Sequence, residues 1–250
     1  MRRGSYRDRA VVVRTYDFGE ADRIIVLLTR THGVVRSVAK GVRRVKSRFG
    51  SRLQPFVDLD VHLYRGKNLA TVTEADTVAY YGAGIIEDYD RYTAACAVLE
   101  TAERLAGMEA AAGDPYLYET VTETFARMQS TGHPSLVLDA FCLQAMSHAG
   151  WAPGLFQCAQ CGVAGPHHAF HPAVGGAVCF RCRPSGSADV PEESLRLMWL
   201  LAHSHWSEAR RLAEGPGGPQ LVAAAHQLST AHLQWHLETR ITSLKVMDQR

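Results

Sequence analysis

Hydrophobic and polar positions in the first 80 residues follow patterns typical of β-strands. Residues 10–16, 23–30 and 34–40 are apolar or β-branched runs separated by turn residues. Residues 56–64 alternate most clearly, since the apolar side chains of the odd-numbered positions 57 to 63 share one face. A fifth run, 69–77, follows a tight connection at residues 65–68. Five short strands with close turns predict a small Greek-key barrel of the OB kind, and an SH3-like barrel is the alternative.

From residue 84 onwards the apolar positions recur every three to four residues, which predicts α-helices. The predicted helices cover residues 88–106, 116–128, 135–149, a segment that opens at 191 and runs through 200, and 220–244. Gly113, Asp114 and Pro115 are expected to stop the first helix and cap the second. We therefore predict an α+β protein, with a five-stranded OB-fold β-barrel in residues 1–81 and an α-helical domain in 82–250.

Charge is distributed unevenly along the 250 residues, although the formal net charge is only +2. Residues 1–52 hold 14 Lys and Arg against four acidic residues, a balance of +10, and the remaining 198 residues carry −8. A basic block within a folded pattern favours a polyanion-binding first part, whereas the simpler alternative is a solvated basic face.

The basic block is densest between residues 34 and 57, which contain seven cations and no acidic residue. Cations on a loop beside a barrel can follow a phosphate backbone without reading its sequence. Phe49 within the run either stacks on bases or packs in the core. The predicted DNA-contacting residues, including two from the connection at 65–68, are Arg36, Lys40, Arg43, Arg44, Lys46, Arg48, Phe49, Arg52, Arg65 and Lys67.

Four cysteines interrupt the helical part with the most specific spacing in the chain. Cys158 and Cys161 form one C-x2-C pair, and Cys179 and Cys182 form a second pair after 17 residues. This spacing is typical of one structural Zn²⁺ bound by four thiolates, in a module covering about 155–184. Two disulfides or a thioredoxin-like redox pair are the alternatives. A closed four-sulfur shell leaves no position for water, so we expect a role in folding.

Enzyme signatures are absent from the sequence, which contains no phosphate-binding GxxxxGK[ST] loop, GxSxG elbow or strand-linked GxGxxG. A metal-dependent nuclease is an alternative, but an alternating strand and the charged first turn of a helix explain its carboxylates equally well. These carboxylates are Asp58 and Asp60 on one strand face and the cluster Glu87, Asp88 and Asp90. His232 and His236 lie one helical turn apart and are either half of a metal site or packing residues. We expect a protein that is not an enzyme.

Compartment and membrane association are also constrained. No apolar run approaches the ~18 residues that a membrane-spanning helix requires, and the first residues lack a secretory hydrophobic segment. Six cysteines in a chain of this length do not suggest a disulfide scaffold. We therefore expect a cytoplasmic protein with no membrane partner.

The order of motifs resembles that of the bacterial DNA repair protein RecO family. The resemblance rests on residues 12–25, 27–30, 39–41, 47–50, 53–56 and 63–66, and on 150–153 followed by the first cysteine pair. It covers nearly the whole chain, and the four cysteines place the sequence with the zinc-containing members. The final helices match by pattern more than by motif.

The resemblance implies an N-terminal OB-fold, a helical domain with an embedded zinc module, and a role in the RecF pathway of repair and recombination. RecO-like proteins bind single- and double-stranded DNA and anneal complementary strands without ATP. With RecR they help load RecA on DNA coated by single-stranded DNA-binding protein (SSB), and they associate with the nucleoid during repair. The family contacts the acidic C-terminal tail of SSB, for which Arg91, Arg104, Arg127, Arg210 and Arg211 are candidates. A zinc-stabilised RNA-binding module is the alternative from another class.

Overall fold

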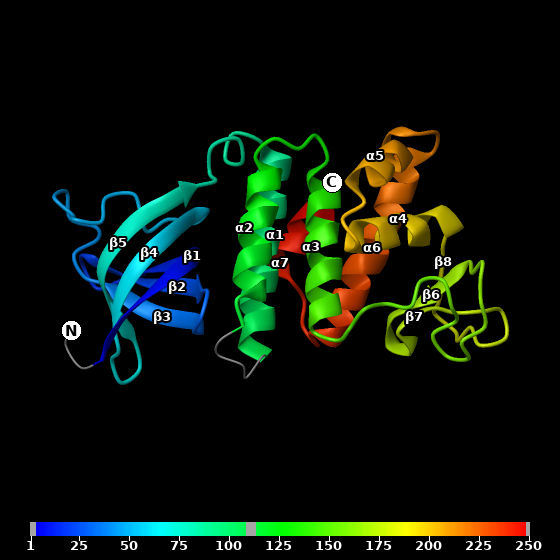
Figure 1. Cartoon of the computed structure of the whole chain (residues 1–250), viewed down its shortest axis with the longest axis horizontal. Coiled ribbons are helices and arrows are strands. Elements are labelled where there is room, and N and C mark those ends of the chain that lie inside the picture. The colour runs from blue at the N-terminus through cyan, green and yellow to red at the C-terminus, as the bar shows by residue number, and fades with distance from the viewer. Residues whose placement is uncertain (1–3, 109–113, 249–250) are drawn as a thin grey trace. The chain divides into compact units, whose positions relative to one another are not determined.

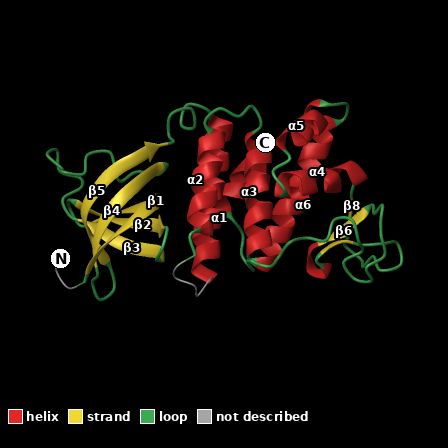
Figure 2. Ribbon diagram, viewed as in Figure 1, coloured by secondary structure: helices red, strands yellow, loops and turns green. Residues whose placement is uncertain are grey.

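The computed structural model describes residues 4–108 and 114–248. Contacts within the chain divide it into two compact units, Met1–Ser130 and Thr131–Arg250. In the residues that the structure describes, the first unit contains a barrel and two helices, and the second contains five helices and a small sheet. Figures 1 and 2 show these elements. The same contacts group the first two helices with the barrel. The predicted domain boundary between residues 81 and 82 stays a prediction.

The predicted five-stranded barrel and the α+β fold class are confirmed. The strands close in the order β1-β2-β3-β5-β4, and every pairing is antiparallel except the short parallel one between β3 and β5. This arrangement is consistent with the predicted OB-fold. The strands are β1 (Ser5–Phe18), β2 (Asp22–Thr29), β3 (Gly33–Ala39), β4 (Val57–Tyr64) and β5 (Ala70–Tyr80).

The barrel core follows from the alternation in β4. Val57, Leu59, Val61 and Leu63 are all buried in one cluster of apolar side chains, as their spacing predicted. Burial of an aliphatic side chain contributes about 1.5–3 kcal/mol, so four in a row fix the register of the strand.

Two helices, α1 (Tyr89–Met108) and α2 (Tyr116–Met128), pack beside the barrel in the same unit. Phe125 of α2 makes an edge-to-face contact with Phe56, with ring centroids 5.4 Å apart. The carboxylate of Asp114 accepts a hydrogen bond from the backbone N–H of Tyr116 at 2.9 Å, although the cap position of α2 is Pro115, one residue after the predicted Asp114. Gly113, the predicted helix stop, lies outside the described residues.

The second unit differs from prediction in two helices. The single helix expected over 220–244 is two helices, because the chain reverses at Glu238, which has a left-handed φ of 51°. A further helix, α5, forms where none was predicted. The helices of this unit are α3 (Pro134–His148), α4 (Glu192–Ala202), α5 (Trp206–Glu214), α6 (Gly218–His236) and α7 (Thr242–Asp248). Within the described residues, no helix combines the length and apolar character needed to cross a membrane.

The chain between α3 and α4 forms a small sheet, with the first cysteine pair before its strands and the second pair between β7 and β8. Its strands, in the order β7-β6-β8, are β6 (Ala169–His171), β7 (Gly176–Ala177) and β8 (Ala188–Asp189), with a 3-10 turn at Pro172–Val174. Cys158, Ala169 and Val178 form its small buried cluster.

Candidate nucleic-acid interface and metal centre

The connection between β3 and β4, residues 40–56, is here called the basic loop. Its apolar side chains anchor it, since Phe49 is 1% exposed and Leu53 is also buried in the barrel core. Its first turn is held because Gly41, with a φ of 68°, donates its N–H to the Asp22 carboxylate at 2.7 Å. Arg52 donates to the carbonyl oxygen of Ala75 in β5 at 3.1 Å. The basic loop is therefore attached to the barrel at both ends.

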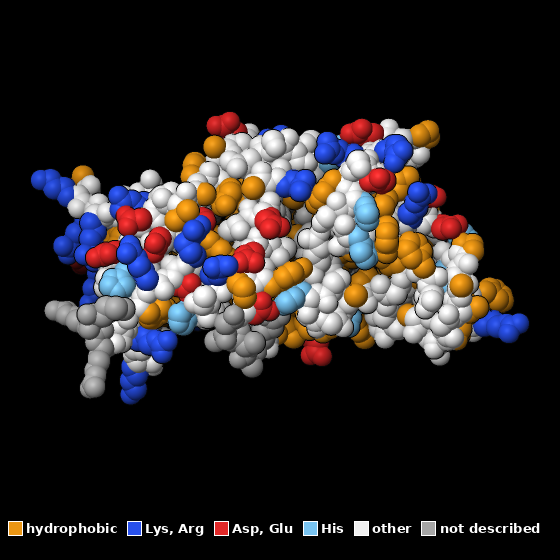
Figure 3. All heavy atoms as spheres, in the orientation of Figure 1, with side chains coloured by type: hydrophobic (Ala, Val, Ile, Leu, Met, Phe, Trp, Pro, Cys, Tyr) orange, Lys and Arg blue, Asp and Glu red, His pale blue; other side chains and the backbone are white. Residues whose placement is uncertain are grey.

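The cations of the basic loop and its neighbours face solvent. Figure 3 shows Lys and Arg side chains gathered over the barrel. All nine predicted DNA-contacting cations are exposed: Arg36, Lys40, Arg43, Arg44, Lys46, Arg48, Arg52, Arg65 and Lys67. These side chains are accessible to a polyanion in solution.

Most of these cations also lack an acidic partner. Arg43 lies 3.5 Å from the Asp17 carboxylate, and the guanidinium of Arg65 stacks over the ring of Tyr6. Among the described residues, the other seven predicted cations form no ion pair. Their positive charge is therefore not neutralised within the part of the chain that the structure describes.

The aromatic residues near the basic loop are mainly structural. The ring of Phe49 lies in the barrel core with the Arg48 guanidinium 4.8 Å from its centroid, so it is removed from the set that could stack on bases. Phe56 is also buried. Tyr16 and Tyr64 are partly exposed, as are Phe18 of β1 and Tyr80 of β5, so these rings are accessible from solvent.

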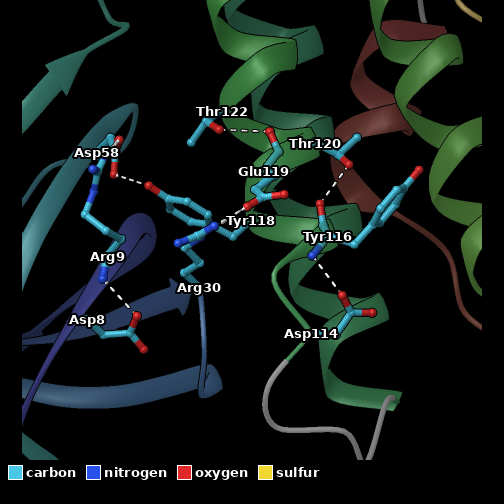
Figure 4. A network of polar contacts seen from close by, with 10 residues as sticks. All are labelled: Asp8, Arg9, Arg30, Asp58, Asp114, Tyr116, Tyr118, Glu119, Thr120 and Thr122. Atoms are coloured by element: carbon cyan, nitrogen blue, oxygen red, sulfur yellow. Dashed lines mark hydrogen bonds and ion pairs between the residues drawn. The ribbon is translucent and has the colours of Figure 1, made fainter.

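Other arginines of the basic block are used inside the first unit (Figure 4). Arg9 pairs with Asp58 of β4, and Asp58 also accepts a hydrogen bond from the Tyr118 hydroxyl of α2 at 2.7 Å. Arg30 pairs with Glu119 of α2 at 2.7 Å. Burial, followed by the hydrogen bond to Asp58, raises the pKa of Tyr118, so this hydroxyl stays a donor. These contacts fasten α2 to the barrel.

The same network bears on Asp58 and Asp60, two of the carboxylates on which the nuclease alternative rests. Asp58 is 2% exposed and engaged by Arg9 and Tyr118, which indicates a structural role. Asp60 pairs with Arg7 at 3.0 Å. In the described part of the chain, the only group of three or more metal-binding side chains that lie together is the four cysteines. The nuclease alternative therefore lacks an assembled metal site among these residues.

The four predicted cysteines meet at one point. Each pair lies in a tight turn: Gly162, with a φ of 73°, donates its N–H to the Cys158 carbonyl at 2.8 Å, and Cys182 donates to the Cys179 carbonyl at 3.1 Å. All four sulfur atoms lie within 4.8 Å of one another, and Cys161 Sγ is 3.8 Å from Cys179 Sγ. The centre is able to hold a metal ion.

Backbone donors favour the thiolate form of Cys158, whereas hydrogen bonds with the side chains of Cys161 and Cys179 raise the pKa of Cys182 to about 12. Burial raises the pKa of Cys158, but hydrogen bonds from backbone N–H groups, that of Cys179 first, outweigh it and lower the pKa to about 6. Cys179 donates to Cys158 Sγ at 3.4 Å. Thiolate is the form that binds a metal ion.

The histidines left open by the sequence are packing residues. His232 is buried, and its Nε2–H donates to the carbonyl oxygen of Trp151 at 3.0 Å. His236 stacks on the Trp151 ring. His167, in the cysteine module, contacts the Val163 carbonyl through Nε2 at 3.1 Å.

Comparison with known protein families matches almost the entire chain. The family model described as recombination protein O N terminal matches residues 1–81, and the one described as recombination protein O C terminal matches residues 86–245. The first covers the barrel with its basic loop, and the second covers most of the helices and the four-cysteine centre. The chain therefore belongs to the recombination protein O (RecO) family.

Proposed function

We propose that this protein binds single- and double-stranded DNA through the basic loop and anneals complementary strands without ATP. Membership of the RecO family supports a role in DNA repair and recombination. The observation that carries the proposal is a set of exposed cations without ion pairs on a loop whose apolar residues are fixed in the barrel. In this role the protein acts in the cytoplasm, at the nucleoid during repair.

Annealing of this kind requires charge rather than chemistry. Two complementary strands repel each other through their phosphates, and a cationic surface that holds both lowers that repulsion. Contacts to phosphates position the strands and leave the base edges free to pair. No catalytic group is needed, and we propose that the protein is not an enzyme.

The metal that we propose for the four-cysteine centre is one structural Zn²⁺. Zn–S bonds of about 2.3 Å in a tetrahedron place sulfur atoms about 3.8 Å apart. The distance between Cys161 Sγ and Cys179 Sγ is 3.8 Å, which fits. Bound Zn²⁺ would hold the two turns together and so stabilise the small sheet between α3 and α4.

From its family, we propose that the protein binds RecR and the acidic C-terminal tail of SSB. We also propose a functional link to RecA. Of the five candidate arginines for the SSB tail, Arg91 already donates to the carbonyl oxygens of Gly84 and Gln129 at 3.0 and 2.9 Å. The remaining four candidates are exposed: Arg104, Arg127, Arg210 and Arg211.

A strand-annealing assay with and without SSB, together with metal analysis of the purified protein, tests the proposal. We expect annealing without nucleotide and about one zinc per chain. A variant with Arg44, Lys46 and Arg48 changed to Ser should anneal slowly and should melt like the wild type, since these side chains are exposed. Tight binding of folded RNA without annealing of DNA would favour the RNA-binding alternative.

A further inference from the structure

A second, oppositely charged surface lies in the first unit. Residues 74–90 contain five acidic residues and no basic one, in contrast to the seven cations and no acid of residues 34–57. Two of these carboxylates face cations, since Asp76 lies 3.7 Å from Arg7 and Asp88 lies 3.8 Å from Arg91, whose guanidinium also donates to the carbonyl oxygens of Gly84 and Gln129. This segment covers the end of β5 and the start of α1, and its excess of acidic over basic residues favours a positively charged partner.

Apolar side chains are exposed within this acidic segment. Val78, Tyr80, Ile86 and Tyr89 are each about half exposed, with the exposed Glu87 and Asp90 beside them. Figure 3 shows hydrophobic side chains gathered over this connection between β5 and α1. We call these six residues the acidic patch. An exposed apolar group rimmed by charge is typical of a protein contact.

The basic loop has the complementary arrangement. Val45 at its tip is fully exposed, and the exposed cations Arg44 and Lys46 flank it. An apolar tip with positive neighbours matches an apolar patch with negative neighbours both in hydrophobicity and in charge. Both halves of such a contact are present on every copy of the chain.

We propose that the basic loop of one copy binds the acidic patch of a second copy. The contact is head to tail, so each pair leaves one loop and one patch free, and assembly grows with protein concentration. DNA uses the same cations and therefore competes with the second copy. This competition rests on the proposed function, whereas the contact itself does not.

Sedimentation of the full chain and two variants tests the contact. The loop variant carries Arg44→Ser, Val45→Ser and Lys46→Ser, and the patch variant carries Val78→Ser and Ile86→Lys. We expect the average mass of the wild type to rise with concentration at about 0.1 M salt and to fall to that of a monomer at about 1 M, where the Debye length is only about 3 Å. Each variant alone should remain a monomer.

Mixing the two variants is the decisive step. The loop variant keeps its patch and the patch variant keeps its loop, so the mixture should form a one-to-one dimer and nothing larger. Melting temperatures close to that of the wild type would show that both variants fold. A monomeric wild type at all concentrations, a mixture that stays monomeric, or a patch variant that assembles like the wild type would each overturn the contact.

DNA binding separates this inference from the proposed function. The patch variant should bind single-stranded DNA as tightly as the wild type, and added DNA should dissociate the wild-type assemblies. If the loop variant binds DNA like the wild type, the proposed DNA site fails whatever the sedimentation shows. If the loop variant loses DNA affinity but the wild type does not self-associate, the proposed DNA site stands and the contact between two copies is rejected.

Discussion

Neutralising the free cations of the basic loop should reduce the salt dependence of DNA binding by a defined amount. The perturbation is the triple change Arg44→Ser, Lys46→Ser and Arg48→Ser. Arg43 is left in place because it pairs with Asp17, and Arg52 because it donates to the Ala75 carbonyl. The three chosen side chains are exposed and form no ion pair within the described residues.

The magnitude follows from counterion release. Adding the exposed cations Arg36 and Lys40 gives about five phosphate contacts and a slope of log affinity against log salt of about −3.5 for single strands. Between 50 and 200 mM salt the wild type should then lose about a hundredfold in affinity. The triple variant loses about three contacts, so its slope should be about −1.4 and its loss about sevenfold.

Fluorescence anisotropy with a labelled oligonucleotide at several salt concentrations measures both slopes. A matched control changes three arginines that pair internally, Arg7, Arg14 and Arg30, to Gln, which removes the same formal charge. The control should keep the wild-type slope. If the loop variant keeps that slope, or if both variants lose it equally, the basic loop does not contact phosphates as inferred.

Four further outcomes are expected. Phe49→Ala should cost about 3–5 kcal/mol of unfolding free energy, because the ring lies in the barrel core, and should leave DNA affinity unchanged while the protein is folded. Cys158→Ser should lower both metal content and melting temperature, whereas Cys96→Ser, outside the centre, should keep the metal. Tyr118→Phe should destabilise the first unit by about 1.5–3 kcal/mol in chemical denaturation, since a buried carboxylate loses a hydrogen bond. Burial lowers the pKa of His232 to about 4, so on acidification the unfolded chain binds a proton before the folded chain does. Lowering the pH from 6.5 towards 4 should therefore reduce the free energy of unfolding by up to about 3 kcal/mol. The reduction should be smaller in His232→Gln.

Local patterns were sufficient for the strands and for the metal centre. In β4, alternation identified the buried face because a barrel strand has one side in the core. The two cysteine pairs were found because two tight turns with this spacing can present four sulfurs to one point. Both inferences needed only the residues of one segment or one motif.

Features that depend on packing between distant segments could not be found in this way. Phe49 lies in a run of cations, and only the closed barrel shows that its ring fills the core. Asp58 occupies the polar face of β4, yet Tyr118 of α2 covers it, 60 positions later in the chain. The break at Glu238 follows from a left-handed backbone that the helical pattern of residues 220–244 does not reveal.

Among the described residues, the arginines of the basic block divide into two groups by what surrounds them, and we expect the two groups to differ in function. Arg9 pairs with Asp58 within the barrel, and Arg14 and Arg30 pair with carboxylates of α1 and α2 and so fasten these helices to the barrel. The cations of the basic loop lie in a stretch of chain that contains no acidic residue. The buried side chains of Phe49 and Leu53 hold this stretch against the barrel, while its charged side chains face solvent. A count of +10 alone would assign all of them to DNA. Because a paired arginine must first give up its carboxylate to bind a phosphate, DNA contacts are expected from the second group, and the salt slope measures that group alone.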